Sequence, residues 1–193
     1  SYLKTSSSAL YGAFGEPYKT KLPYTFTDLY GKVSINSPTG GKLSLFGFSF
    51  NDRVNFVGTS DLNWKSYGIG ANFVLTPISS SSLISGSFNY SDYKIALLEA
   101  DNRPRQSDIN GFDANVKVTS FFPNHSELIY GLEFTGFKTG YQFYNFVGVK
   151  LEQNDYTTQI GGFMKLKKSF SDKFILEPGI RVQYYASINV PRV

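Results

Sequence analysis

The side chains with the clearest potential for binding chemistry are two arginines separated by one proline. Arg103 and Arg105 flank Pro104, and the planar guanidinium group of arginine donates paired hydrogen bonds to carboxylates and phosphates. We therefore predict that both arginines bind an anionic group of a ligand. Ion pairs within a surface loop would explain the same residues without a ligand.

A second group with binding potential places aromatic rings beside an amide. Tyr141, Phe143, Tyr144 and Asn145 lie within one short segment. Aromatic faces combined with an amide suit sugars and flat ligands. The alternative interpretation is an aromatic extension of a strand that packs on neighbouring loops.

The composition argues against catalysis and metal binding. The chain has no cysteine and a single histidine, His125, which lies in a Pro-Asn-His-Ser turn signal. Thiolate chemistry needs a cysteine. A metal site needs several converging donors, and a lone turn histidine supplies visible material neither for such a site nor for a Ser-His-Asp relay. We expect no enzyme activity, no catalytic residue, no metal and no cofactor. The net charge is +4, but the basic residues are scattered singly, so we expect no nucleic-acid partner.

The elements that carry these residues read as long strands. From Ile109 to Tyr130 apolar and polar residues alternate, with Phe112, Val116 and Val118 on one side, and after a turn the same sidedness resumes with Leu132. A period of two places an apolar row on one face of a sheet and a polar row on the other. We predict a hairpin here and antiparallel strands along the rest of the chain.

Charged residues occupy the polar face of these predicted strands. If the apolar face meets lipid, the polar face lines a water-filled or plugged lumen. The residues that we predict to face this lumen are Asp113, Lys117, Glu133, Glu177 and Arg181.

The remaining pattern gives further strand predictions. The segment 42–56 has Phe46, Phe48 and Phe50 on one side, and 137–155 reads as a long aromatic-rich connection. The segment 1–5 reads as the end of a strand and 6–23 as a polar loop. Pro178 must fall at a bulge or where no ladder hydrogen bond is needed.

The spacing of the turn signals separates two architectures. Short turns are predicted near residues 38, 79, 124 and 171, with longer loops between them, and this alternation is typical of an up-and-down outer-membrane barrel. The strands exceed the ~9 to 11 residues that cross a bilayer. A soluble β-sandwich has turns about every 8 to 12 residues, so we predict an all-β, antiparallel transmembrane barrel segment of eight to nine strands.

Several runs in order along the chain resemble the barrel region of Bacteroidetes-type TonB-dependent outer-membrane receptors. The runs that carry this resemblance are Leu22–Lys32, Leu45–Phe48, Asp61–Trp64, Asn72-Phe73 with Pro77, Arg103–Arg105, Ile109–Phe112, Phe143–Asn145, Thr157-Thr158, Glu177-Pro178 and Gln183–Ser187.

The resemblance implies a barrel of 22 strands around a plug domain, which imports a scarce solute with energy delivered by TonB. Siderophores, glycans, peptides and cobalamin are all compatible substrates. Residues 1–193 would then be one part of the barrel wall, with the plug and the remaining strands outside this chain. Expected partners are outer-membrane lipid and lipopolysaccharide, the plug and TonB, and a surface lipoprotein. Lipopolysaccharide contact is a further interpretation of Arg103 and Arg105.

Two other functions remain open from the sequence. One is a barrel of the same outer membrane that serves adhesion or assembly and transports nothing. The other is a soluble β-sandwich that binds carbohydrate.

Overall fold

The computed structural model describes residues 24–56, 59–101, 103–123, 125–171 and 174–192. The strand end predicted at 1–5 and the loop predicted at 6–23 lie outside these residues. The described part is all-β, with the strands β1 (Tyr24–Asn36), β2 (Lys42–Phe56), β3 (Ser60–Leu75), β4 (Ser82–Glu99), β5 (Arg105–Phe122), β6 (Ser126–Tyr144), β7 (Lys150–Ser171), β8 (Phe174–Leu176) and β9 (Gly179–Arg192).

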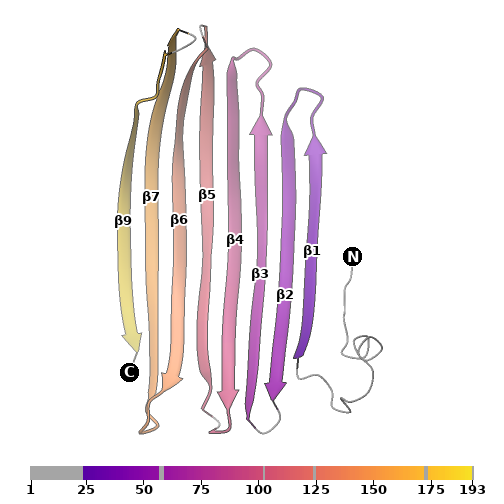
Figure 1. Ribbon diagram of the computed structural model, residues 1–193, viewed down its shortest axis with the longest axis vertical. Coiled ribbons are helices and arrows are strands. Elements are labelled where there is room, and N and C mark those ends of the chain that lie inside the picture. The colour runs from indigo at the N-terminus through magenta and orange to yellow at the C-terminus, as the bar shows by residue number, and fades with distance from the viewer. Residues whose placement is uncertain (1–23, 57–58, 102, 124, 172–173, 193) are drawn as a thin grey trace.

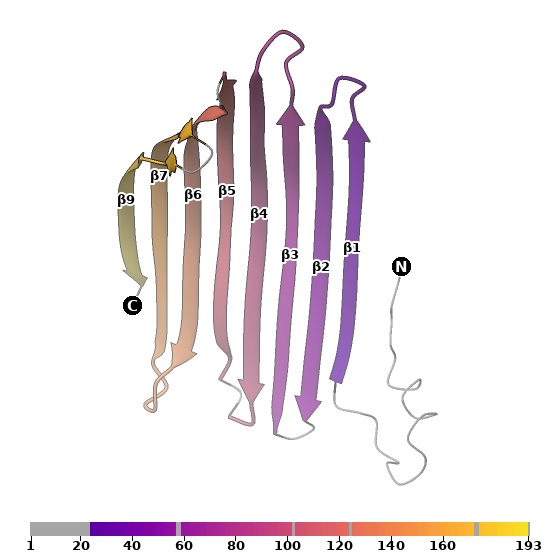
Figure 2. The same cartoon turned by 45° about the horizontal axis from the view of Figure 1, so that its top comes forward.

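All of these strands belong to one antiparallel sheet with up-and-down topology. Each of β1 to β7 pairs with the next strand along the chain, and β8 and β9 both pair with β7. Figure 1 shows the strands side by side in chain order, and the order is unchanged when the molecule is turned in Figure 2. The predicted antiparallel, up-and-down fold is confirmed.

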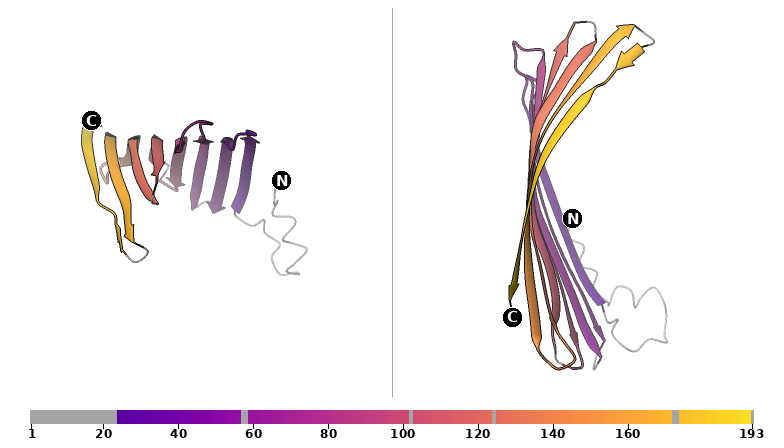
Figure 3. Two further views of the ribbon diagram at one scale, coloured as in Figure 1. Left: turned by 90° about the horizontal axis from the view of Figure 1, so that it is seen from above. Right: turned by 90° about the vertical axis from the view of Figure 1, so that its left-hand side faces the viewer.

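The sheet is a single twisted layer that does not close on itself. The views in Figure 3 show one layer whose outer strands, β1 and β9, lie at opposite ends of the row. No pairing joins β1 to β9 in the described part of the chain. The closed barrel and its number of strands therefore remain predictions.

The register assigns every side chain of the sheet to one of two faces. Directly paired residues share a face in an antiparallel sheet, so the pairing places odd-numbered residues of β1 to β3 with even-numbered residues of β4 to β7 and of β9. We call this side face A and the opposite side face B.

Face A carries an apolar band that crosses the whole sheet. One row runs Ile35, Leu43, Phe73, Gly86, Val116, Leu132, Gly162 and Val182 from β1 to β9. The next rows add exposed side chains of the same kind: Val33, Leu45, Leu75, Phe88, Tyr130, Phe134, Ile160, Met164, Ile180 and Tyr184. On β7 the band runs from Tyr156 to Leu166, which is about 33 Å at ~3.3 Å per residue.

No hydrophobic side chain is buried among the described residues. The chain exposes 13713 Å², compared with about 9,200 Å² for a compact monomer of 21.6 kDa. Leu132 remains 68% exposed and Val182 70% exposed. No described residue therefore forms a protein layer over the apolar band.

Phenylalanine rings cover glycines across neighbouring strands. Phe46 pairs with Gly70 and Phe48 with Gly68, and a Cβ atom added to Gly68 would lie 2.7 Å from Phe48 Cε1. The same arrangement occurs on other strands, where Phe73 pairs with Gly86, Phe112 with Gly136 and Phe163 with Gly131. Aromatic residues beside strand glycines fill the space that the missing side chain leaves.

These pairs correct one expectation from the sequence. The phenylalanines of β2 were expected to form its apolar side, but Phe46 and Phe48 lie on face B, and Leu43 and Leu45 supply the band instead. The phenylalanines occupy face B because the glycines opposite them leave room for their rings.

The connections also differ from the sequence prediction. The turns at 37–41, 76–81 and 123–125 form the end that we call the turn end, which is at the top of Figure 1. At the other end, called here the loop end, residues 57–59, 100–104 and 145–149 join the strands. Counted between the strand bounds, these loops have three, five and five residues and the turns have five, six and three, so the expected alternation of short and long connections is wrong. The segment 137–155 is mostly strand, because β6 and β7 extend on both sides of 145–149.

Pro178 lies where its missing N–H group does least harm. It falls between β8 and β9, and its carbonyl accepts a hydrogen bond of 2.9 Å from the Leu166 amide. Ile175 and Leu176 of β8 keep the same register against β7 as β9 does, and the register shifts only nearer the turn, between Ser169 and Ser171. The prediction that Pro178 lies outside the regular ladder is confirmed.

Candidate functional site

Both arginines of the predicted anion site contact groups of the chain itself at the loop end. Arg105 forms ion pairs with Glu99 and, at 3.9 Å, with Asp101. The Arg103 guanidinium donates to the carbonyl oxygen of Asn145 at 3.4 Å, and the Arg103 amide donates to the Asp101 carboxylate at 3.0 Å. This geometry favours ion pairs within a loop, which is the second of the two interpretations from the sequence.

The predicted aromatic group is divided between the two faces. Tyr141 and Phe143 lie on face B with ring centroids 6.0 Å apart, and the Tyr141 hydroxyl donates to Gln153 at 2.7 Å. Tyr144 lies on face A. Asn145 shapes the connection, because its side-chain oxygen accepts a hydrogen bond from the Val149 amide at 2.9 Å. Only Tyr141 and Phe143 can therefore contact one ligand from the same side of the sheet.

Face B carries a second aromatic group at the loop end, on β1 to β3. Phe26, Asp52 and Trp64 form one row across these strands. Together with Tyr24 and Asp28 they line an open hollow of about 460 Å³. Aromatic faces beside carboxylates bind sugar hydroxyls or organic cations.

Sequence reasoning missed this hollow because its residues come from three strands. The available signal is Trp64, the single tryptophan of the chain, which has Asp61 and Asn63 as near neighbours. The period of two does not show which residue of a neighbouring strand lies opposite Trp64. The cross-strand register supplies that information.

Four of the five charged residues predicted to face a lumen lie on the side opposite the apolar band, and the fifth pairs with a lysine of that side. Asp113, Lys117, Glu133 and Arg181 are on face B. Arg181 pairs with Glu133, and Thr135 donates to Asp113 at 3.1 Å. Glu177, in the interruption between β8 and β9, pairs with Lys165. The register thus separates charge and apolar surface onto opposite faces.

The polarity of the two faces is exchanged toward the loop end. There face A carries Asn51, Lys65 and Lys94, whereas face B carries Trp64 and Ile95. The apolar part of face A therefore ends in the middle of the sheet. Beyond that line the same side of the sheet is polar.

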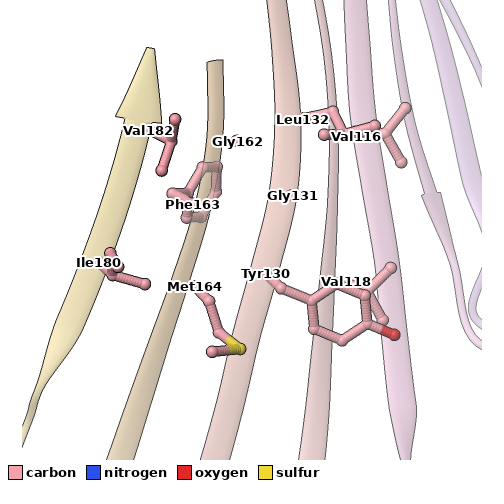
Figure 4. A pocket seen from close by; sticks show the side chains of 10 residues that line it. All are labelled: Val116, Val118, Tyr130, Gly131, Leu132, Gly162, Phe163, Met164, Ile180 and Val182. Atoms are coloured by element: carbon pink, nitrogen blue, oxygen red, sulfur yellow. The ribbon is translucent and has the colours of Figure 1, made fainter.

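A shallow apolar hollow lies within the band on β5, β6, β7 and β9. It has a volume of about 620 Å³, and Figure 4 shows its lining, which includes Val116, Leu132, Met164 and Val182. Gly162 stands between Leu132 and Val182 in one row. Because Gly162 has no side chain, the band is hollowed there and can accept a flexible apolar chain.

An ion pair near the loop end of face A shifts the pKa of a carboxylate. Arg53 on β2 donates through Nε to Asp61 on β3 at 2.9 Å, and a second guanidinium nitrogen contacts the other carboxylate oxygen. This paired hydrogen bond with Arg53 lowers the pKa of Asp61 below its ordinary value. The carboxylate form of Asp61 is therefore favoured in the folded chain.

Within the described part of the chain, no helix has the length and apolar character needed to cross a membrane. The same residues contain no cluster of three or more side chains suited to hold a metal ion. No protein-family model matches the sequence, and comparison with curated proteins gives no match.

Proposed function

We propose that this chain is part of the wall of a TonB-dependent receptor in the outer membrane of a Gram-negative bacterium, where it contributes to active uptake of a scarce solute. The observation that carries the proposal is the exposed apolar band of face A, which crosses every long strand of the sheet. An exposed apolar surface of this extent needs a covering phase.

The dimensions of the band agree with a bilayer. For strands tilted by ~40°, the length of about 33 Å on β7 corresponds to about 25 Å along the membrane normal, which is the height of the apolar band of outer-membrane barrels. Tyr67 and Tyr156 lie in the row where the band ends. Tyrosine is frequent at the level of lipid headgroups.

Face B then lines the interior of the barrel. Its charged residues beside the band, such as Glu133 and Arg181, contact water or a plug domain. Toward the loop end, the hollow beside Trp64 and the stacked rings of Tyr141 and Phe143 are placed to contact the solute. The open edges at β1 and β9 pair with further strands that complete the proposed barrel of 22 strands.

Spin labels on adjacent residues of opposite faces test the lipid contact. The chain has no cysteine, so a single introduced cysteine carries the label. In lipid vesicles, labels at Val116, Leu132 and Val182 are expected to collide with oxygen and to be shielded from a water-soluble nickel complex. Labels at Lys117 and Gln183 are expected to show the reverse. Nickel accessibility at all three band positions would contradict membrane insertion.

A barrel of the same membrane with an adhesion or assembly role shares this lipid contact. Transport differs because it needs a plug domain and a segment that binds TonB. Reading the coding sequence on both sides of this chain separates the two functions, since a plug-like domain upstream supports transport. A surface lipoprotein as partner at the loop end is part of the transport proposal.

A further inference from the structure

Three lysines lie on face A at the border of the apolar band, Lys138 in its last row and Lys65 and Lys94 in the row beyond it. Lys65 on β3 and Lys94 on β4 are direct partners in the register, so their Cβ atoms are roughly 4.5 to 5.5 Å apart. Lys138 on β6 lies in the adjacent row, with Nζ 5.8 Å from the centroid of the Tyr156 ring. Among the described residues, none of these three lysines forms an ion pair. We call them the lysine cluster.

The acidic residues nearest to the cluster leave it with an excess of positive charge. Asp108 pairs with Lys94 in the register. Its carboxylate, however, lies beside Gly140 on β6, because a Cβ atom added to Gly140 would be 2.7 Å from Asp108 Oδ1. Asp92 lies opposite Tyr67, one row nearer the band. Like charges directly opposite each other destabilise a sheet, so an anion between Lys65 and Lys94 would remove an unfavourable contact.

The position of the cluster defines the kind of anion. The row of Tyr67, Asp92, Asn110, Lys138 and Tyr156 marks the end of the band, and Lys65 and Lys94 lie in the next row. On the other side of that boundary the band offers continuous apolar surface. A ligand that contacts both the lysine cluster and the apolar band has acyl chains joined to a negatively charged headgroup.

We propose that the lysine cluster binds the phosphate group of a membrane lipid whose acyl chains lie on the apolar band. The lipid belongs to the leaflet at the loop end. When the loop end faces the cell exterior, as the proposed contact with solute and lipoprotein requires, this leaflet is lipopolysaccharide. Lys65 and Lys94 contact the phosphate, and Lys138 adds charge from β6. This inference rests on the proposed function, because it needs the band to lie in a bilayer.

Electron paramagnetic resonance of spin-labelled lipids tests the inference. The full chain is reconstituted in phosphatidylcholine vesicles with a trace of spin-labelled phosphatidic acid, which has a phosphate monoester headgroup, or of spin-labelled phosphatidylcholine. We expect a preference for phosphatidic acid that falls by about two- to fivefold in Lys65→Gln and again in Lys94→Gln. Unlabelled lipid A is expected to displace the labelled phosphatidic acid, and inorganic phosphate at equal concentration is not.

The control is Lys117→Gln, which removes a lysine from face B and is expected to leave the preference unchanged. Equal restriction of both labelled lipids, or a preference unchanged in both cluster variants, would overturn the inference while leaving membrane insertion intact. Displacement by inorganic phosphate would also overturn it, because the site would then recognise a free ion. If neither lipid shows a motionally restricted component, the proposed function itself fails.

Discussion

At the residue scale, the ion pair between Arg53 and Asp61 predicts that the pKa of Asp61 depends on Arg53. Arg53→Ala removes the paired hydrogen bond that lowers the pKa of Asp61, so this pKa is expected to rise toward the ordinary range of an aspartate. Carbon-13 NMR of the Asp61 carboxyl during a pH titration in detergent micelles measures the change. Lys65→Ala, on the same face but outside the pair, is the control. An unchanged Asp61 pKa in Arg53→Ala would show that the pair does not form.

The sign of the linked stability follows from this lowered pKa. Because the folded chain favours the ionised form of Asp61, the pair stabilises the fold fully above the pKa of Asp61 in the unfolded chain. Its contribution is lost as the pH falls through the lower folded pKa. Arg53 is exposed and Asp61 is half-buried, so solvent screens the pair and its effect on stability is small.

The covered glycines give a second prediction at the residue scale. Gly68→Ala places a Cβ atom 2.7 Å from Phe48 Cε1 and 2.9 Å from the Tyr90 carbonyl oxygen. We therefore expect the free energy of unfolding to fall by about 1 to 3 kcal/mol. Gly31→Ala is the matched control, because nothing lies within 4 Å of its added Cβ, and there alanine is expected to stabilise by about 0.4 to 1 kcal/mol. Urea unfolding in detergent micelles measures both. Equal effects would contradict the covering role of Phe48.

The sequence could not supply the partners of individual residues. Arg105 pairs with Glu99 on the neighbouring strand, and Arg103 reaches Asn145 across a second connection. These contacts depend on how three strands end at the loop end. The spacing of Arg103 and Arg105 in the sequence predicted a site for an anion. The structure shows that Arg105 already forms ion pairs with acidic residues of the same chain.

At the scale of the element, alternation was sufficient to predict most strands. It placed Phe112, Val116 and Val118 on one face with Leu132, as the structure does. It assigned β2 wrongly, because both sides of that strand carry apolar residues, and only pairing with β3 shows that Leu45 belongs to the band. A period of two gives sidedness within a strand, whereas the match between strands comes from their pairing.

Pro178 separates β8 from β9, so replacing it is expected to join them into one strand. Leu166 already donates to the carbonyl of residue 178, and proline cannot return the second hydrogen bond of that pair. Pro178→Thr supplies an amide there, so we expect the free energy of unfolding to rise by about 0.5 to 1.5 kcal/mol and hydrogen exchange to become slower at the flanking residues Glu177 and Gly179. Pro77→Thr is the control, because Pro77 lies in the turn 76–81 and gains no ladder partner. Faster exchange at Glu177 and Gly179 would contradict a continuous strand.

At the scale of the whole molecule, the described residues form a sheet with two different faces and without a buried hydrophobic core. These residues form one layer with apolar and charged surfaces on opposite faces along the band, and with the polarity exchanged toward the loop end. The sequence predicted this separation of faces, yet sidedness within a strand is the same whether lipid, a second sheet or another chain covers the apolar side. The closure of the sheet depends on what pairs with β1 and β9, and the chain alone does not determine it.

The exposed band predicts that the whole molecule needs an amphiphile to stay dispersed. Side chains such as Leu132 and Val182 are more than half exposed, and apolar surface of this extent associates in water. Sedimentation of the full chain is expected to show bound detergent above the critical micelle concentration and large aggregates below it. Leu132→Ser with Val182→Ser, compared with Lys117→Ser with Gln183→Ser on face B, should reduce the bound detergent only in the first pair. A stable monomer without detergent would show that protein covers the band, and the soluble carbohydrate-binding sandwich would then replace the barrel.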